Sequence, residues 1–283
     1  MSDFGGAVRQ SDTYEFAIIG IPYDEKSSFL KGAAMGPAAV RKASTEAAIN
    51  AWTELNVNLA EDTSVVDLGD VDVSEDFVFI VKRVREAVSG IMEKSAVPVV
   101  IGGDHSISYP VVAALAGSYP ALDILHFDAH PDLYDHFRGD RYSHACPFAR
   151  ILEEAHVKNL VQVGIRAAIP EHRAMAERKG VTMIEMKELD ANMIPELAFD
   201  NPLYISVDID ALDPAFAPGV SHHEPGGLST RQILQFIHGL QPRAGIVGMD
   251  LVEVNGIRDT SGITAAAAVK ILMEMMGKAV LSR

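Results

Sequence analysis

Apolar residues along this chain gather in short runs that alternate with amphipathic segments. Eight runs have the length of a β-strand, at residues 15–21, 64–68, 97–101, 122–127, 160–163, 181–184, 203–207 and 245–252. Helical spacing predicts helices at 77–94, 107–116, 149–154, 170–179, 230–240 and 264–278, and Pro37 suits the first turn of another. Strands that alternate with helices form parallel sheets covered on both faces. We therefore predict an α/β fold, a three-layer αβα domain with a parallel sheet of about eight strands.

The length of the chain and the even distribution of its elements favour one domain over residues 1–283. A chain of 283 residues with 48% hydrophobic content can bury a large core. No repeat, low-complexity tract or linker divides it. No apolar stretch has the ~18 residues that a membrane span needs, and the first residues lack the apolar segment of a secretory signal. We expect a cytoplasmic protein that does not enter a membrane.

The charge balance favours some partners over others. With 24 Lys+Arg against 39 Asp+Glu, the formal charge of -15 repels nucleic acid and favours a cationic small molecule. Acidic surfaces are also common in proteins without such a ligand, so the charge alone is weak support. The single cysteine, Cys146, excludes an intrachain disulfide and is expected to be a packing residue that can be replaced.

Three polar clusters begin where three apolar runs stop. They are Gly-Gly-Asp-His at 102–105, Asp-Ala-His-Pro-Asp at 128–132 and Asp-Ile-Asp at 208–210. Parallel sheets place their ligands at the carboxyl ends of the strands. If the strands continue through these clusters, residues two apart share a face, so Asp128, His130 and Asp132 converge, as do Asp208 and Asp210.

Two imidazoles and four carboxylates suit Mn²⁺ better than an ion that prefers thiolates. So many crowded carboxylates resist joint ionisation unless cations lie among them, and six ligands exceed what one ion with an open position needs. Two ions about 3.5–4 Å apart hold a hydroxide between them and polarise the electrophile. The chain has no G-x-S-x-G elbow, and the glycines at 102–103 are too few for a dinucleotide fingerprint. The pattern predicts a two-metal hydrolase.

These motifs resemble those of a known family. GGDHS (102–106), DAHPD (128–132) and SVDIDALDPAFAPG (206–219) are similar to the three signature motifs of the ureohydrolases, the arginase and agmatinase family. Further segments are similar as well: SSFLKGAAMGP (27–37), ISYPVV (107–112), YSHACPFARI (142–151), QVGIR (162–166), GVSHHEPGGLS (219–229) and GMDLVEVN (248–255). The likeness is greatest to the agmatinase-like branch, which includes plant-type arginases.

The resemblance implies a role for each residue of the clusters. One Mn²⁺ would be held by His105, Asp128, Asp132 and Asp208, and the other by Asp128, His130, Asp208 and Asp210. Asp128 and Asp208 would then bridge two Mn²⁺ ions per subunit, and Asp132 would orient the shared hydroxide. Glu253 would bind the guanidinium, for which a carboxylate is a suitable bidentate partner, and His144 would carry protons to the leaving amine. His126 is expected to be structural, not a seventh ligand.

The resemblance implies that the substrate is a guanidino compound, cleaved to urea and an amine. Animal-type arginases hold the α-carboxylate with an Asn, where this chain has Tyr134, and the α-amino group with an Asp after the QVGIR run, where this chain has Ala167, Ala168 and Ile169. These departures favour agmatine, cleaved to putrescine and urea, although plant-type arginases share much of the pattern and act on arginine. In a third alternative, guanidinobutyrate hydrolysis, a cation of a mouth loop, Arg138 or Arg141, would pair with the carboxylate.

Other interpretations remain open. Metal-dependent deacetylases share the architecture but bind a single zinc, and a family member without activity would serve as a scaffold. His136, His222, His223 and Glu224 fall in predicted mouth loops, where we favour a surface position over contact with substrate. The family commonly forms trimers and hexamers, so the resemblance implies a homo-oligomer.

Overall fold

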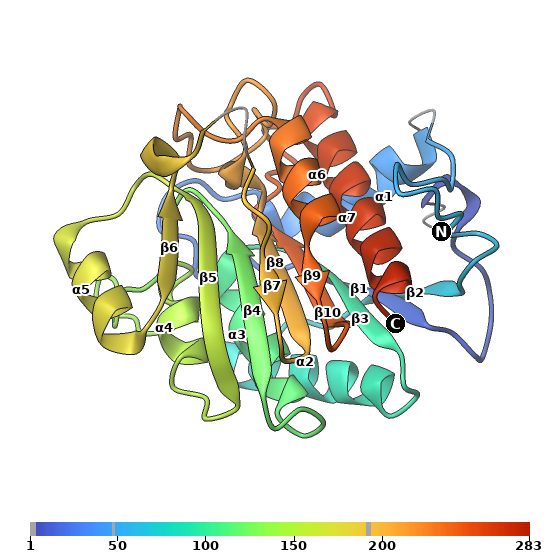
Figure 1. The fold of residues 1–283 in the computed structure, drawn as a ribbon, viewed down its shortest axis with the longest axis horizontal. Coiled ribbons are helices and arrows are strands. Elements are labelled where there is room, and N and C mark those ends of the chain that lie inside the picture. Colours follow the sequence, from blue (N-terminus) through green and yellow to red (C-terminus); the bar gives the residue numbers. More distant parts are fainter. Residues whose placement is uncertain (1–3, 47–48, 191–193) are drawn as a thin grey trace.

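The architecture centres on an eight-stranded sheet in which every neighbouring pair of strands is parallel. The computed structural model describes residues 4–46, 49–190 and 194–283. The strand order is β2-β1-β3-β10-β8-β4-β5-β6 (Figure 1). The strands are β1 (Phe16–Ile21), β2 (Val65–Asp70), β3 (Val97–Gly102), β4 (Leu122–Phe127), β5 (Val157–Ile165), β6 (Thr182–Glu185), β8 (Leu203–Asp208) and β10 (Ile246–Val252). The predicted sheet is confirmed.

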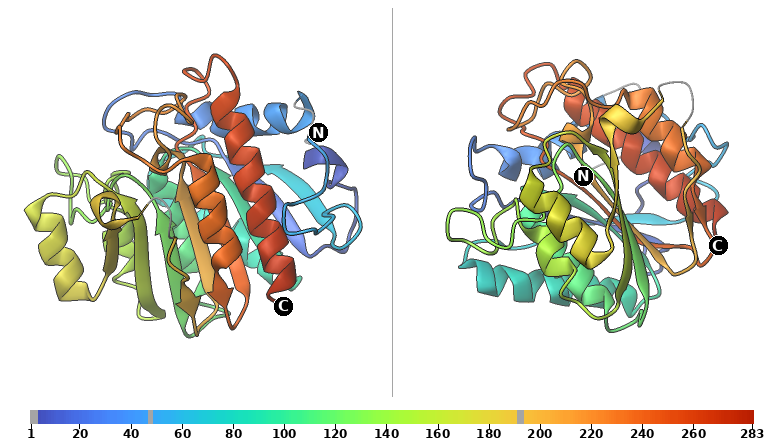
Figure 2. Two further views of the ribbon diagram at one scale, coloured as in Figure 1. Left: turned by 45° about the horizontal axis from the view of Figure 1, so that its top comes forward. Right: turned by 60° about the vertical axis from the view of Figure 1, so that its left-hand side comes forward.

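Helices cover both faces of the sheet, as the alternation of strands and helices predicts (Figure 2). The helices are α1 (Gly36–Glu46), α2 (Phe77–Met92), α3 (Ser108–Leu115), α4 (Pro147–Ile151), α5 (Pro170–Lys179), α6 (Thr230–Gly239) and α7 (Ile263–Leu281). Helices α1, α6 and α7 share one apolar core with Phe16 and Ile18 of β1. Helices α2 to α5 contribute to a second core with Ala17 and Ile19, the residues that alternate with the first pair.

The structure adds one small element that the apolar pattern did not predict. Strands β7 (Ala198–Phe199) and β9 (Gln241–Pro242) form a separate parallel pair of two residues each. Segments this short carry no periodicity, so only the tertiary contact defines them. Within the described residues, no helix has both the length and the apolar character that crossing a membrane requires.

The strand order decides which loops meet. Strands β3, β10, β8 and β4 are consecutive neighbours in the middle of the sheet and run in the same direction. Their carboxyl ends therefore lie at one edge, although β3 and β10 are far apart along the chain. This order brings together the three clusters that begin at residues 102, 128 and 208, and it places Glu253 beside them.

Candidate active site

The polar clusters converge, but not by the strand alternation that the sequence suggested. The chain leaves the extended conformation after Phe127, and Asp132 has a left-handed backbone with φ of 51°. Asp208 is the last residue of β8, and Asp210 lies in a 3-10 turn, Ile209–Ala211, where the amide of Asp210 donates a hydrogen bond to the Asp208 side chain. The prediction that extended geometry aligns these side chains is therefore wrong. Tight turns after each strand aim them into one space.

The GGDH cluster depends on a close backbone approach. A Cβ on Gly103 would lie 1.9 Å from the carbonyl oxygen of Tyr23. The same carbonyl accepts a hydrogen bond from the amide of Asp104 at 2.8 Å, and the carbonyl of Gly103 accepts one from the amide of Glu253 at 2.8 Å. Only glycine fits against the backbone of Tyr23 at this position. Because Gly103 also pairs with the backbone of Glu253, it sets the positions of His105 and Glu253 relative to each other.

Three of the predicted carboxylate ligands lie around Nδ1 of His105. His105 Nδ1 lies 3.3 Å from Asp128 Oδ2, 3.2 Å from Asp132 Oδ2 and 3.3 Å from Asp208 Oδ2. Ligand atoms on one tetrahedral or octahedral ion with bonds of about 2.0–2.2 Å are separated by about 3 Å or slightly more. Within the part of the chain that the structure describes, His105 Nδ1 is also a buried nitrogen without a hydrogen-bond partner. This donor set fits a divalent cation.

A chain of buried hydrogen bonds explains why Nδ1 of His105 is the nitrogen left free. Tyr204 and Ser206 each donate a hydroxyl hydrogen bond of 2.6 Å to the carboxylate of Asp250. Ser206 has one hydroxyl proton, so its oxygen accepts from His105 Nε2 at 3.0 Å. All four side chains are fully buried. In this arrangement the ring proton is on Nε2, and the lone pair of Nδ1 faces the three carboxylates.

A second group of ligands forms beside the first. His130 Nδ1 lies 3.4 Å from Asp128 Oδ1 and 3.2 Å from Asp210 Oδ2. Asp128 thus presents one oxygen to His105 and the other to His130, which is the arrangement of a bridging carboxylate. Asp208 Oδ1 accepts the amide of Asp210 at 2.8 Å, and its bridging role stays a prediction.

The cluster is electrostatically strained without cations. Burial, together with Asp210 and Asp128, raises the pKa of Asp208 well above its usual range. Burial and Asp128 also raise the pKa of Asp210, to about 6, although His130 opposes this change. Burial alone lowers the pKa of His105, but the carboxylates of Asp128, Asp132 and Asp208 raise it well above normal. Cations among these oxygens would relieve the repulsion between them.

His126 supports the cluster and is not positioned as a ligand. Its atoms lie close enough to His105 and Asp128 to be considered for a metal. However, Nε2 is 2.9 Å from Asp128 Oδ2, and Nδ1 accepts from Gln162 Nε2 at 2.9 Å, so both nitrogens are engaged. The ring also stacks on Phe148 with a centroid distance of 3.7 Å. The expected structural role agrees with this geometry.

His144 and Glu253 form a pair beside the ligand groups. His144 Nδ1 lies 2.9 Å from Glu253 Oε1, which also accepts the amide of His105 at 3.1 Å. The other oxygen, Glu253 Oε2, is buried and has no hydrogen-bond partner among the described residues. Burial opposes the charge on both groups, yet their mutual attraction raises the pKa of His144 to about 9 and lowers that of Glu253. The amide nitrogen and the hydroxyl oxygen of Ser28 lie 3.1 Å and 2.9 Å from His144 Nε2.

A cavity of about 170 Å³ opens above these groups. The predicted residues His130, Asp132, His144, Asp208, Asp210 and Glu253 line it, together with Ser28, Tyr134, Phe137, Ala145, Ala167, His172 and His222. His222 is therefore a cavity residue, and the preference for a surface position is wrong for it, whereas His136 and His223 are exposed as expected. Phe137 and His172 were not singled out, because a lone aromatic residue or histidine has no local signature.

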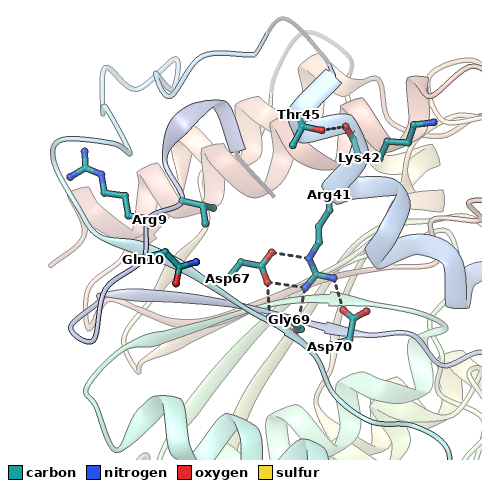
Figure 3. A pocket seen from close by; sticks show the side chains of 9 residues that line it. Arg9, Gln10, Arg41, Lys42, Thr45, Asp67, Gly69 and Asp70 are labelled. Atoms are coloured by element: carbon teal, nitrogen blue, oxygen red, sulfur yellow. Dashed lines mark hydrogen bonds and ion pairs between the residues drawn. The ribbon is translucent and has the colours of Figure 1, made fainter. Parts of the chain in front are cut away.

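A second hollow lies far from this chemistry, at the β2 edge of the sheet. It measures about 520 Å³ and is bordered by Arg9, Arg41, Asp67 and Asp70, among others. Figure 3 shows the guanidinium of Arg41 turned toward Asp67 and Asp70, and Arg41 Nε lies 2.8 Å from Asp67 Oδ2. Arg41 is thus paired with two carboxylates that border this hollow.

A parallel α/β sheet that carries buried Asp and His ligands beside a small cavity defines a metal-dependent hydrolase. The model of the arginase family matches residues 14–277, and the chain belongs to that family, whose members are hydrolases acting on guanidino compounds. "Arginase 1, mitochondrial" of Arabidopsis thaliana is 44% identical over 276 residues, covering 93% of this chain and 80% of that protein.

Two solved structures support the same assignment. The arginase from Medicago truncatula has a TM-score of 0.87 at 42% identity, covering 93% of this chain and 86% of that chain. The agmatine ureohydrolase of Thermoplasma volcanium has a TM-score of 0.84 at 29% identity, covering 98% of this chain and 94% of that chain.

Proposed function

We propose that this protein hydrolyses the guanidinium group of L-arginine and releases urea and L-ornithine. The observation that carries the proposal is the 44% identity to a plant arginase over 93% of the chain, against 29% identity to the agmatine ureohydrolase. The sequence analysis favoured agmatine, because Tyr134 and Ala167 replace residues that hold the amino-acid head group in animal-type arginases. The plant arginase similarity outweighs that argument.

The edge of the cavity supports a zwitterionic substrate. Arg138 donates a hydrogen bond of 2.8 Å to the carbonyl of Ser28, a cavity residue. Glu224 is half-buried, and its carboxylate lies 3.8 Å from His130 Nε2. An amino-acid head group carries both a carboxylate and an ammonium, so it suits an edge that offers both signs of charge. Arg141, the other cation considered, is held bidentately by Glu153 instead.

We propose two Mn²⁺ ions as the cofactor of this site. His105, Asp128, Asp132 and Asp208 would hold one, and Asp128, His130, Asp208 and Asp210 the other. When bound, the ions supply a hydroxide nucleophile at neutral pH and polarise the electrophile. Oxygen and imidazole donors match Mn²⁺ better than a thiolate-preferring ion.

The remaining residues bind the substrate and move protons. The free oxygen of Glu253 accepts an N–H of the guanidinium, which satisfies a carboxylate oxygen that is otherwise buried and unpaired. Asp132 orients the nucleophile by accepting a hydrogen bond from it. His144, whose ring proton is shared with Glu253, transfers a proton to the leaving amine.

Agmatine is a second candidate substrate. Ala167 lines the cavity and offers no carboxylate for an α-amino group. The test is urea release from arginine, agmatine and guanidinobutyrate by protein reconstituted with Mn²⁺. The highest kcat/KM is expected for arginine, and the highest value for agmatine would overturn the choice of substrate. Lack of urea release from all three would overturn the proposed activity.

A further inference from the structure

His172 is a buried histidine in the cavity wall whose outer nitrogen has no hydrogen-bond partner. The side chain is 3% exposed, and Nε2 is buried without a partner among the described residues. Buried polar atoms in folded proteins are nearly always paired, so such an atom at a cavity calls for an explanation. Helix α5 holds the ring in place, because His172 is at the third position of its first turn.

The position of the ring proton follows from the other nitrogen. The amide of Ile169 approaches His172 Nδ1 at 3.4 Å. An amide N–H only donates, so Nδ1 accepts and the proton of the neutral ring is on Nε2. His172, which lines the cavity, therefore carries a buried hydrogen-bond donor that lacks an acceptor among the described residues.

The surroundings of His172 indicate which part of the substrate lies there. Tyr134 packs edge-on against His172 with a centroid distance of 4.2 Å, and Phe137 lies 5.0 Å from Tyr134. The guanidinium carbon of Arg138 lies 5.2 Å from the centre of the Phe137 ring. This wall of the cavity thus combines an aromatic surface with two donors and carries none of the predicted metal ligands.

We propose that His172 is a specificity-determining residue whose Nε2–H binds the carboxylate of the substrate tail. The inference rests on the proposed guanidino hydrolysis and assigns the substrate class as guanidino acids, arginine included. Agmatine ends in an ammonium, which only donates, and would leave the His172 N–H unpaired. A buried donor left without an acceptor costs binding free energy, so this histidine selects against agmatine.

A pair of substitutions separates recognition from helix capping. His172→Asn places an amide oxygen near the position of Nδ1, which keeps an acceptor for the Ile169 amide and removes the outer donor. His172→Gln places an amide nitrogen near the position of Nε2, which keeps the donor. Asn is expected to lower kcat/KM for arginine and guanidinobutyrate by about tenfold to a hundredfold through KM, since a hydrogen bond to a charged group is worth about 1.5–3 kcal/mol. Agmatine is expected to change less than twofold, and Gln to retain more activity than Asn.

The outcomes are distinguishable from failure of the proposed function. Equal losses for guanidinobutyrate and agmatine in His172→Asn, or no loss for either, would overturn the role of His172 while the wild-type activity stands. Absence of urea release by the wild-type protein would overturn the proposed function itself. If His172 only donated a hydrogen bond to the π face of Tyr134, the substitution would lower kcat/KM equally for both substrates. The ratio of kcat/KM for guanidinobutyrate to kcat/KM for agmatine is therefore the deciding measurement.

Discussion

The carboxylate of Glu253 has one oxygen bonded to His144 Nδ1 at 2.9 Å and the other buried without a partner. Glu253 also has a left-handed backbone with φ of 63°, which a glutamate rarely adopts. This backbone conformation directs the side chain from the end of β10 toward the cavity. A carboxylate with one unpaired oxygen, held by a strained backbone beside the predicted metal ligands, is the arrangement expected for binding a guanidinium.

Glu253→Gln keeps the size of the side chain and removes its charge. We expect kcat/KM for the preferred guanidino substrate to fall by about a hundredfold, because a charge-assisted hydrogen bond of about 1.5–3 kcal/mol is lost. Steady-state urea release measures the effect. Glu177→Gln, at an exposed position of α5, is the control and should match the wild type. Unchanged kinetics in Glu253→Gln would contradict the assignment of the guanidinium site.

Asp128→Asn tests the bridging carboxylate. Both oxygens of Asp128 face ligand histidines, so the neutral amide weakens both metal positions at once. We expect loss of most Mn²⁺ binding in calorimetric titration and loss of most urea release. Asp12→Asn, an exposed substitution, should bind as the wild type does. Two ions retained with wild-type affinity in Asp128→Asn would contradict the two-metal arrangement.

Arg138→Ala tests the charge at the cavity edge. An exposed ion pair is worth about 0.2–1 kcal/mol, so kcat/KM for arginine should fall by about two- to fivefold, with agmatine unaffected. Arg141→Ala is the matched control, since Glu153 already holds Arg141. A larger loss of kcat/KM for arginine in Arg141→Ala than in Arg138→Ala would show that Arg138 is not the residue that contacts the carboxylate.

Cys146 is expected to be chemically inert in the native protein. Burial first, and then the carboxylate of Asp132, raise the pKa of the thiol to about 12, so the reactive thiolate is scarce at pH 8 and increases only as the pH approaches that value. Mass spectrometry after iodoacetamide treatment should show slow alkylation in the native state and rapid alkylation in urea. Cys146→Ala should retain urea release, and loss of activity without loss of stability would disprove a packing role.

Gly103→Ala tests the close backbone approach behind the GGDH cluster. Its Cβ would overlap the backbone of Tyr23, so a segment must shift, and we expect the free energy of unfolding to drop by about 2 kcal/mol or more. Urea denaturation measures the loss. Gly117→Ala, whose Cβ would meet only Ala114 O at 3.9 Å, should lose less. Equal stabilities of the two variants would show that the approach is not required.

The sequence by itself determined the layered sheet, and it predicted the six ligand residues that the fold brings together. Apolar runs of strand length are recognised from local spacing alone. Residues of metal-binding type, such as Asp128 and His130, are recognised from their position directly after such a run. Sequence similarity to ureohydrolases also pointed to His144 and Glu253. All of these are properties of short segments or of motifs, which a linear chain displays directly.

Only the tertiary structure decided how those residues act together. The order β3-β10-β8-β4 brings Glu253 beside His105. Ser206 of β8 and Asp250 of β10 orient His105, which lies in the turn after β3, through hydrogen bonds. His222 and His172 line the cavity as well, and their roles depend on neighbours that are distant in sequence. Hydrogen bonds and electrostatic interactions act over a few ångströms in space, and local spacing does not specify which distant residues come that close.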